Sequence, residues 1–166
     1  MIDRTMFREA MSTFPAGVTV VTALGEDGAI TGFTASAFSS LSLDPSLVLI
    51  GPARTSITYG NILARRSFAI QFLADDQKAV AYAFASKGPN KLPSSEWRLS
   101  ANGNPVLRRH ACLIEWTLWQ EYDGGDHAII VGAVQSIERC DADALFYYRG
   151  DMFARSADQL ASPDGT

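Results

Sequence analysis

The chain has 166 residues, of which 47% are hydrophobic and 19% charged, and its formal net charge is −4. A chain of this length is expected to form one domain, residues 1–166, around a substantial core. Its 14 lysines and arginines are scattered, which argues against a nucleic-acid partner, because phosphate binding depends on clustered positive charge. No apolar run approaches the roughly 20 residues that a membrane span requires, so no membrane association is expected.

The N-terminal stretch MIDRTMFREAM is charged from its third residue and lacks the apolar segment of a signal peptide, so a cytoplasmic location is expected. Two cysteines, Cys112 and Cys140, give no disulfide framework. His110 and Cys112 are two residues apart, but His127 is the only other histidine, so no zinc or other metal site is expected.

The first predicted element is an amphipathic helix over residues 1–14. Its apolar residues recur at helical spacing from Phe7 to Phe14, Asp3 is a suitable N-cap, and Pro15 ends the helix. The next segments predict a hairpin with strands at 17–24 and 29–38, followed by a strand at 46–50. A helix at 55–66, a strand at 67–73 and a helix at 76–86 are expected after it. Asp75 or Asp76 can cap the last of these helices.

Two prolines within residues 87–97 predict a loop. Beyond it, alternating hydrophobicity predicts a long hairpin with strands at 110–122 and 128–138. A last strand with a tight turn is predicted at 144–155. The core is expected to span about 7–155, and residues 156–166 to form a flexible tail. Strands paired mainly through hairpins indicate an antiparallel barrel or sandwich with a few flanking helices.

Hydroxyl side chains are concentrated in the stretch GFTASAFSSLS. Along a strand, Gly32, Thr34 and Ser36 share one face, which predicts a small, hydroxylated surface that a ligand can approach closely. Ser39 and Ser40 are expected in the loop that leads to Asp44-Pro45.

A second hydroxyl cluster, R-T-S-I-T at residues 54–58, lies where a helix is expected to begin. Helix N-termini bind phosphate, and Arg54 adds positive charge, although Thr55 and Ser56 are also ordinary capping residues. Both clusters flank one buried strand, which favours a phosphorylated planar ligand.

Gly124-Gly125-Asp126-His127 reads either as a polar turn or as an imidazole placed at a sheet end to contact a substrate amide. Lys91 is either a solvated loop residue or a phosphate contact. The chain lacks a G-x-G-x-x-G fingerprint, a Walker loop and a G-x-S-x-G elbow, so dinucleotide binding by a Rossmann fold is not expected and a Ser-His-Asp hydrolase is disfavoured.

In order along the chain, six motifs together resemble the short flavin reductases, the reductase components of two-component flavin-dependent monooxygenases. They are F-x-x-A-M-x-x-F-P-A-G-V-T-V-V-T (7–22), G-x-T-A-S-A-F-x-S-L-S-x-D-P-x-L-V (32–48), T-S-I-T (55–58), A-x-x-F-A-x-x-G-x-x-K (81–91), G-D-H-x-x-x-x-G-x-V (125–134) and Y-Y-R-G (147–150). The resemblance covers residues 7 to about 155.

This resemblance implies a mainly β, antiparallel split β-barrel that binds FMN or FAD, usually as a homodimer. It further implies that NADH or NADPH reduces the flavin by hydride transfer, and that reduced flavin passes to a separate monooxygenase. Flavin contacts are implied for the ring and ribityl region at Thr34, Ala35, Ser36, Ser39, Ser40 and Leu41, and for the phosphate region at Gly51, Arg54, Thr55, Ser56 and Lys91. The implied nicotinamide site comprises Pro15, His127, Arg149 and Gly150, bordered by F-P-A-G (14–17).

Three alternatives stay open from sequence alone. A non-catalytic flavin-binding protein would share the barrel without oxidising NADH. A pyridoxamine-phosphate type oxidase would also share it, but needs a basic phosphate pocket that the sequence does not suggest. A sheet-forming interaction module would use the hydroxyl groups only as surface.

Overall fold

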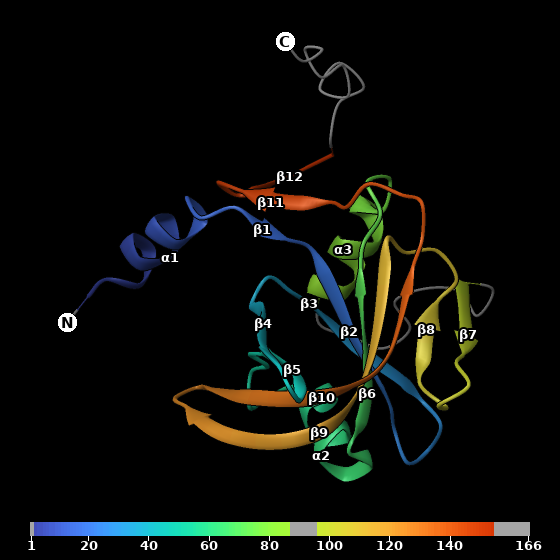
Figure 1. Ribbon diagram of the computed structural model, residues 1–166. Coiled ribbons are helices and arrows are strands. Elements are labelled where there is room, and N and C mark those ends of the chain that lie inside the picture. The colour runs from blue at the N-terminus through green and yellow to red at the C-terminus, as the bar shows by residue number, and fades with distance from the viewer. Residues whose placement is uncertain (1, 87–95, 155–166) are drawn as a thin grey trace.

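The computed structural model describes residues 2–86 and 96–154 of the chain. The predicted loop over 87–97, apart from its last two residues, and the predicted tail over 156–166 lie outside the described residues, as does Lys91. The elements in chain order are α1 (Arg4–Ser12), β1 (Ala16–Gly17), β2 (Thr19–Leu24), β3 (Ile30–Ala35), β4 (Phe38–Leu43), β5 (Ser46–Ile50), α2 (Ile57–Arg65), β6 (Ser67–Phe72), α3 (Lys78–Ala85), β7 (Trp97–Leu99), β8 (Pro105–Leu107), β9 (Cys112–Gly124), β10 (His127–Arg139), β11 (Phe146–Tyr148) and β12 (Asp151–Phe153) (Figure 1).

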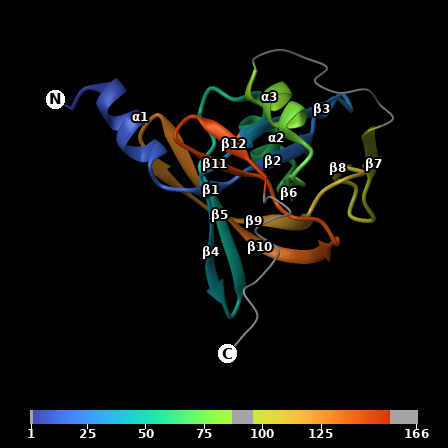
Figure 2. The ribbon, with the colours of Figure 1, turned by 90° about the horizontal axis from the view of Figure 1, so that it is seen from above.

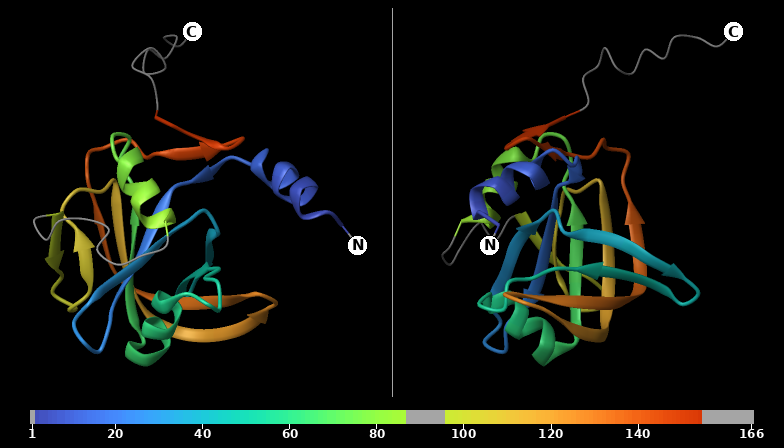
Figure 3. Two further views of the ribbon diagram at one scale, coloured as in Figure 1. Left: turned by 180° about the vertical axis from the view of Figure 1, so that it is seen from behind. Right: turned by 90° about the vertical axis from the view of Figure 1, so that its left-hand side faces the viewer.

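The main sheet is antiparallel and seven-stranded, in the order β3-β2-β6-β9-β10-β5-β4. Its two edge strands, β3 and β4, are consecutive in the chain and are joined only by Ser36 and Ala37. A flat sheet of this size would hold its edges roughly 29 Å apart, whereas the chain from Ala35 to Phe38 spans at most about 11 Å. The sheet must therefore curl until its edges meet at this junction, as the ribbon shows (Figure 3).

Two smaller sheets cover this curled sheet. The strands β1, β11 and β12 form a three-stranded sheet above it, and β7 pairs with β8 at its side (Figure 2). The upper sheet is anchored through Val18, whose N–H donates to the Leu145 carbonyl at 3.0 Å, and through Leu145, whose N–H donates to the Leu73 carbonyl at 2.9 Å.

One cluster of the core lies inside the curled sheet and is built on aromatic contacts, while a second cluster joins Phe84 of α3 to Trp97 of β7. The Trp116 ring is fully buried and lies 4.9 Å from the Phe68 ring and 6.0 Å from the Phe38 ring, measured between centroids. Gly132 on β10 faces this indole so closely that a Cβ there would overlap the Trp116 ring. The alternation predicted for the strand over 110–122 is thus confirmed at Trp116.

Glu115 is a charged residue that the alternation assigns to the outer face, yet it is only 5% exposed. Its carboxylate accepts hydrogen bonds from Ser100 (2.5 Å), Asn102 (3.0 Å), Asn104 (2.9 Å) and Ser136 (2.9 Å). Burial raises the pKa of Glu115, but these bonds together outweigh burial and hold the pKa below its ordinary value of 4.5.

The three predicted helices are confirmed, although their capping differs in one case. Asp3 caps α1 as predicted, accepting from the N–H groups of Thr5 and Met6. The predicted Asp75 or Asp76 cap of α3 is wrong: the N-cap is Gln77, and Asp76 instead binds Arg109 at 2.9 Å. An ion pair with a distant guanidinium has replaced the local capping interaction.

Ser39 and Ser40 are not in a loop, contrary to the sequence prediction. They belong to β4, which pairs with β5 as a hairpin, with a register shift between Ser40 and Ser42. The strand predicted over 29–38 accordingly ends at Ala35, and the chain enters β4 after two residues. Serine has low strand propensity, so the backbone pairing with β5 decides this segment.

Helix α1 projects from the body of the protein (Figure 2). None of its residues is buried, and its large apolar side chains include Phe7 at 56% and Met11 at 55% exposure. Among the described residues, no helix is long and apolar enough to cross a membrane.

Candidate flavin and nicotinamide site

A cavity of about 870 Å³ lies between α1, the upper sheet and the junction of the β3 and β4 edges. It is lined by Phe7, Arg8, Met11, Ser12, Phe14, Pro15, Ala16, Gly17, Val18, Thr19, Ser36, Ala37, Phe38, Phe72, Ala144, Leu145 and Tyr147. This volume is within the range of small-molecule sites. The lining includes Pro15 and Ser36, two residues predicted for the site, and the whole of the predicted F-P-A-G border.

The cavity walls are mainly apolar, with few polar groups directed at a ligand. The Thr19 hydroxyl is used internally, since it donates to the Ala35 carbonyl at 2.7 Å. No hydrogen-bond partner is present for the Ser36 hydroxyl among the described residues. Ser36 is therefore available to bind a ligand at the point where the sheet edges meet.

The junction of the sheet edges connects the cavity to the second predicted cluster. The Gly51 N–H donates to the Ala37 carbonyl at 3.2 Å, and a Cβ at Gly51 would lie 3.4 Å from the Ala37 Cβ. The segment after Gly51 then reaches α2, whose N-cap residue is Ser56. Ser56 makes no side-chain capping bond, so its hydroxyl and the first N–H groups of α2 form a ready anion site.

The segment 51–56 also lies against the tip of the β9–β10 hairpin. Ala53 forms an isolated β-bridge with His127, and the Arg54 N–H donates to the Asp126 carbonyl at 3.1 Å. The Ala128 N–H donates to the Pro52 carbonyl at 2.9 Å. Two predicted groups, the phosphate region and the G-D-H turn, are thus brought together by backbone contacts over more than 70 residues of sequence.

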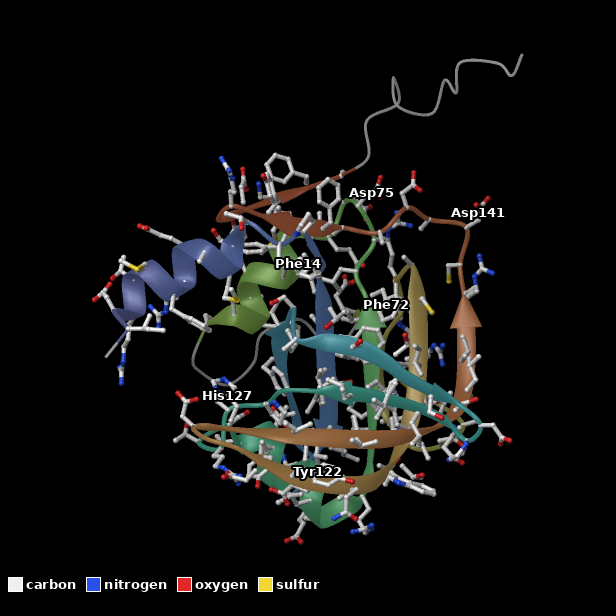
Figure 4. The ribbon with its side chains drawn as sticks, turned by 60° about the vertical axis from the view of Figure 1, so that its left-hand side comes forward. Phe14, Phe72, Asp75, Tyr122, His127 and Asp141 are labelled. Atoms are coloured by element: carbon white, nitrogen blue, oxygen red, sulfur yellow. The ribbon has the colours of Figure 1, made fainter. Side chains whose placement is uncertain are left out.

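His127 is at the hairpin tip, on the side of the molecule from which α1 projects (Figure 4). Its side chain is 51% exposed, and its Nδ1 lies 2.8 Å from Asp126 Oδ1. The hydrogen bond to His127 lowers the pKa of Asp126, and Arg4 of α1 adds a smaller effect in the same direction. Because the carboxylate accepts at Nδ1, the His127 Nε2 is left to contact a ligand.

Arg54 is paired with acidic side chains and is not a free cation, while its contact with a phosphate stays a prediction. Its guanidinium binds Asp123 at 2.6 Å and Glu121 at 3.4 Å on β9. The hydrogen bond to Asp123 is the main reason that the pKa of Arg54 is raised. The side chain holds the 51–56 segment against the hairpin, so its role here is to position the neighbouring backbone.

The strand face shared by Gly32 and Thr34 is not open to a ligand, contrary to the prediction from side-chain alternation along the strand. Helix α3 covers it: a Cβ at Gly32 would lie 2.9 Å from the Phe84 ring, and the Thr34 hydroxyl donates to the Ala81 carbonyl at 2.6 Å. Ala35 is buried. Only Ser36, beyond the end of β3, reaches the cavity from this series.

The remaining predicted residues lie outside the cavity lining. Ser39, Ser40 and Leu41 are exposed on β4. Arg149 and Gly150 form the β11–β12 turn, with φ of 49° and 90°, and the Arg149 N–H donates to the Ser12 carbonyl at 2.8 Å. This turn therefore braces the end of α1 that lines the cavity.

Sequence reasoning missed several cavity residues. Phe7 and Met11 were predicted only as part of an amphipathic helix, whereas they line the cavity, together with Phe72 from the end of β6 and Tyr147 from β11. The helical spacing of Phe7 and Met11 predicts an apolar helix face, but it does not indicate what this face contacts.

Residues 11–156 match the flavin reductase like domain, and the chain belongs to that family. Among curated relatives, the reductase component of a flavin-dependent trigonelline monooxygenase from Acinetobacter baylyi is 39% identical over 93% of this chain and 51% of its own length. The chain thus spans about half of that relative.

Two further relatives are matched over most of their length. The flavin-dependent monooxygenase reductase subunit HsaB of Mycobacterium tuberculosis is 37% identical over 90% of this chain and 81% of its own. A flavin reductase from Pseudomonas putida is 35% identical over 90% and 88%.

Solved structures agree with the fold. BorF, the flavin reductase component of a bacterial two-component tryptophan halogenase, superposes with a TM-score of 0.85 at 36% identity, covering 92% of this chain and 98% of its own. The NADH:FAD oxidoreductase SgcE6 of Streptomyces globisporus, solved with NAD and FAD fragments, gives 0.87 at 30% identity over 94% of each chain. The predicted antiparallel split-barrel class is confirmed.

Proposed function

We propose that this protein is an NAD(P)H:flavin oxidoreductase, which reduces FMN or FAD and supplies the reduced flavin to a separate monooxygenase. One observation carries the proposal: the cavity wall at Ala37 is hydrogen-bonded to the Gly51 N–H, and the chain runs on from Gly51 to the N-terminus of α2. This arrangement connects a proposed apolar ring site to a proposed anion site, within a flavin reductase family.

The residues present fit a flavin. The aromatic walls at Phe38 and Phe72 suit a planar ring system, and Ser36 supplies a hydroxyl without a partner among the described residues. The phosphate group fits the first turn of α2, where Ser56 leaves its hydroxyl and neighbouring N–H groups free. A Cβ at Gly51 would lie 3.4 Å from the Ala37 Cβ, so a larger side chain would crowd the junction between these two places.

When bound, the flavin ring supplies the redox chemistry, accepting a hydride from the reduced nicotinamide. The residues of this chain need only align the two rings and exclude water, and such positioning accounts for a large share of a rate enhancement. The apolar walls from Phe14 to Gly17 border the place where the second ring would stack. No strong acid or base is needed, in keeping with the lack of a catalytic dyad in the sequence.

His127 is the residue proposed to orient the nicotinamide. Its Nδ1 is held by Asp126, so Nε2 is directed away from the turn and can hydrogen-bond the carboxamide of the nucleotide. Lys91, Arg149 and Gly150 are proposed contacts of the phosphate and nicotinamide regions on the basis of the family resemblance.

A homodimer is proposed as the working form. An isolated helix gains little stability without burying its apolar face, yet Phe7 and Met11 of α1, and Phe14 just beyond its end, are all more than half exposed. A second copy would cover this face and close the cavity, which α1 bounds on one side. We also infer a cytoplasmic location, where reduced nicotinamide nucleotides are available.

One assay tests the proposed function. NADH and NADPH absorbance is followed with purified protein and added FMN, FAD or riboflavin; oxidation that requires both protein and flavin is expected. A Ser36→Leu, Ser56→Leu double variant should lose flavin binding and activity, while Ser46→Leu, at the far end of β5, should keep both. Flavin binding without NADH or NADPH oxidation would identify a non-catalytic flavin-binding protein and refute the proposal.

A further inference from the structure

A cluster of three potential metal ligands lies at the end of β10, apart from the cavity residues. His110, Glu138 and Cys140 each offer one ligand atom, and these atoms all lie within 4.8 Å of one another. From the spacing of His110 and Cys112 the sequence predicts no metal site, but the structure places His110 beside Glu138 at the end of β10 and Cys140 just beyond it.

His110 is the buried member of the cluster, and its tautomer is set by the backbone. The side chain is 1% exposed, and its Nδ1 lies 3.0 Å from the Leu107 carbonyl oxygen. A carbonyl only accepts, so Nδ1 carries the proton, and in the neutral ring Nε2 holds a lone pair. A histidine fixed in this way, through the nitrogen that does not bind, is the usual arrangement of a metal ligand.

The Nε2 atom of His110 is buried and has no hydrogen-bond partner among the described residues. Glu138 Oε1 lies 3.4 Å from it. Two acceptor atoms facing each other at this distance repel unless a proton or a metal ion lies between them. The buried nitrogen is therefore directed into the cluster with its hydrogen-bonding capacity unused.

Strand geometry brings the other two ligands to the same place. Glu138 and Cys140 are two residues apart and so share one face of the strand end, while the Cys140 N–H donates to the Ala111 carbonyl at 3.0 Å, next to His110. The Cys140 side chain is exposed. One coordination position would thus be open to solvent.

The distances suit tetrahedral coordination. For bonds of about 2.0–2.3 Å to nitrogen, oxygen and sulfur, ligand atoms are separated by roughly 3.3–3.8 Å. The 3.4 Å between His110 Nε2 and Glu138 Oε1 is already in this range. The Cys140 sulfur lies within 4.8 Å of the other two ligand atoms, and its side chain is exposed.

The charges around the cluster leave these ligand atoms available. Arg98 binds Glu138 through the other carboxylate oxygen, Oε2, at 2.7 Å. Arg109 is paired with Asp76 at 2.9 Å. A divalent cation would be neutralised by the Glu138 carboxylate and a Cys140 thiolate.

We propose that His110, Glu138 and Cys140 form a binding site for a single divalent transition-metal ion, with Zn²⁺ as the preferred ion. Mixed nitrogen, oxygen and thiolate donors select zinc over magnesium or calcium. Bound metal would fasten the end of β10 to the turn before β9. From Cys140 the chain continues to Ala144 and Leu145 in the cavity wall, so the ion would also fix the start of that segment.

The test uses the full chain, stripped of metal with a chelator, titrated with Zn²⁺ by calorimetry and with Co²⁺ by absorption. Equimolar binding, a rise in melting temperature with Zn²⁺ and a thiolate-to-cobalt charge-transfer band are expected. Cys140→Ser should abolish the band and weaken Zn²⁺ binding at least roughly 100-fold, because even loss of an outer-shell partner costs about 10–100-fold. Glu138→Gln, at a half-exposed position, should also weaken binding.

Matched controls use the other thiol and the other imidazole. Cys112→Ser and His127→Gln should bind both metals as the wild type does. The proposal is overturned if the wild type shows no equimolar binding, as expected for a protonated His110 paired with Glu138. It is equally overturned if the charge-transfer band survives Cys140→Ser or disappears in Cys112→Ser.

Discussion

At the scale of single residues, His127 separates nucleotide use from flavin binding. Its imidazole is exposed at the hairpin tip and held by Asp126 at 2.8 Å, while the phosphate region is built on other residues. His127→Ala should raise the KM for NADH about tenfold, which corresponds to about 1.4 kcal/mol, and change the flavin Kd little. Steady-state kinetics and flavin fluorescence titration measure the two effects.

The control for this variant is Gln120→Ala, which truncates an exposed side chain on the same hairpin. It should leave both constants unchanged. Wild-type KM and turnover in His127→Ala would remove His127 from the nicotinamide site.

Glu115 gives a prediction on stability against pH. Its folded-state pKa is below the ordinary value of 4.5, so its network stabilises the fold above that value and loses this contribution as the pH falls through the folded pKa. Glu115→Gln should destabilise the protein by about 1–3 kcal/mol at neutral pH, because donors lose a charged acceptor.

The measurement is urea unfolding of both proteins at neutral and at acidic pH. The difference between wild type and Glu115→Gln should shrink in acid, where the wild-type carboxylate also becomes protonated. A difference that stays constant with pH would show that packing, and not the charge, dominates at this position.

At the scale of elements, alanine substitution of two glycines is expected to have opposite effects on stability. At Gly132 on β10, a Cβ would overlap the buried Trp116 ring, whereas at Gly60 in α2 a Cβ would meet nothing within 4 Å. Gly132→Ala should therefore destabilise by about 1–3 kcal/mol through overpacking. Gly60→Ala should stabilise by about 0.5–1 kcal/mol through helix propensity.

Chemical denaturation of both glycine variants gives the comparison directly. Neither residue lines the cavity, so flavin binding should persist wherever the protein is folded. A neutral Gly132→Ala would mean that the Trp116 ring can move within the core.

The elements that the sequence could predict are those governed by local patterns. The helices and most strands follow from hydrophobic period and capping, as Asp3 shows for α1. β4 could not be predicted, because Ser39 and Ser40 form a strand only through pairing with β5. The commitment of Arg54 to Asp123 depends on a contact between residues 69 apart in sequence, which no local pattern reveals.

The candidate site was predictable to a similar extent. Of the residues that the motifs indicate, Pro15 and Ser36 line the cavity and His127 pairs with Ala53 in the 51–56 segment, while their contacts with flavin or nicotinamide stay predictions. The ligand-facing position predicted for Thr34 from strand alternation was wrong, because helix α3, from a segment far along the chain, covers this side chain.

At the scale of the whole molecule, the exposed face of α1 predicts self-association. Met11→Glu should convert a dimer into a monomer, because a charge would be placed on the apolar face that the second copy covers. Thr5→Glu puts the same charge on the same helix away from that face and should stay dimeric. Light scattering after size-exclusion chromatography distinguishes the two; a dimeric Met11→Glu or a monomeric wild type would contradict the proposed dimer.

The central claim is hydride transfer to a flavin held by this chain, and an anaerobic single-turnover experiment tests it most directly. Protein and an equimolar amount of flavin are mixed with NADH in a stopped-flow instrument, and the oxidised-flavin absorbance is followed. We predict bleaching matched by NADH loss, faster than without protein, and slowed when the transferred hydrogen on nicotinamide C4 is deuterium. Bleaching no faster than in protein-free solution would contradict hydride transfer to a flavin held by this protein.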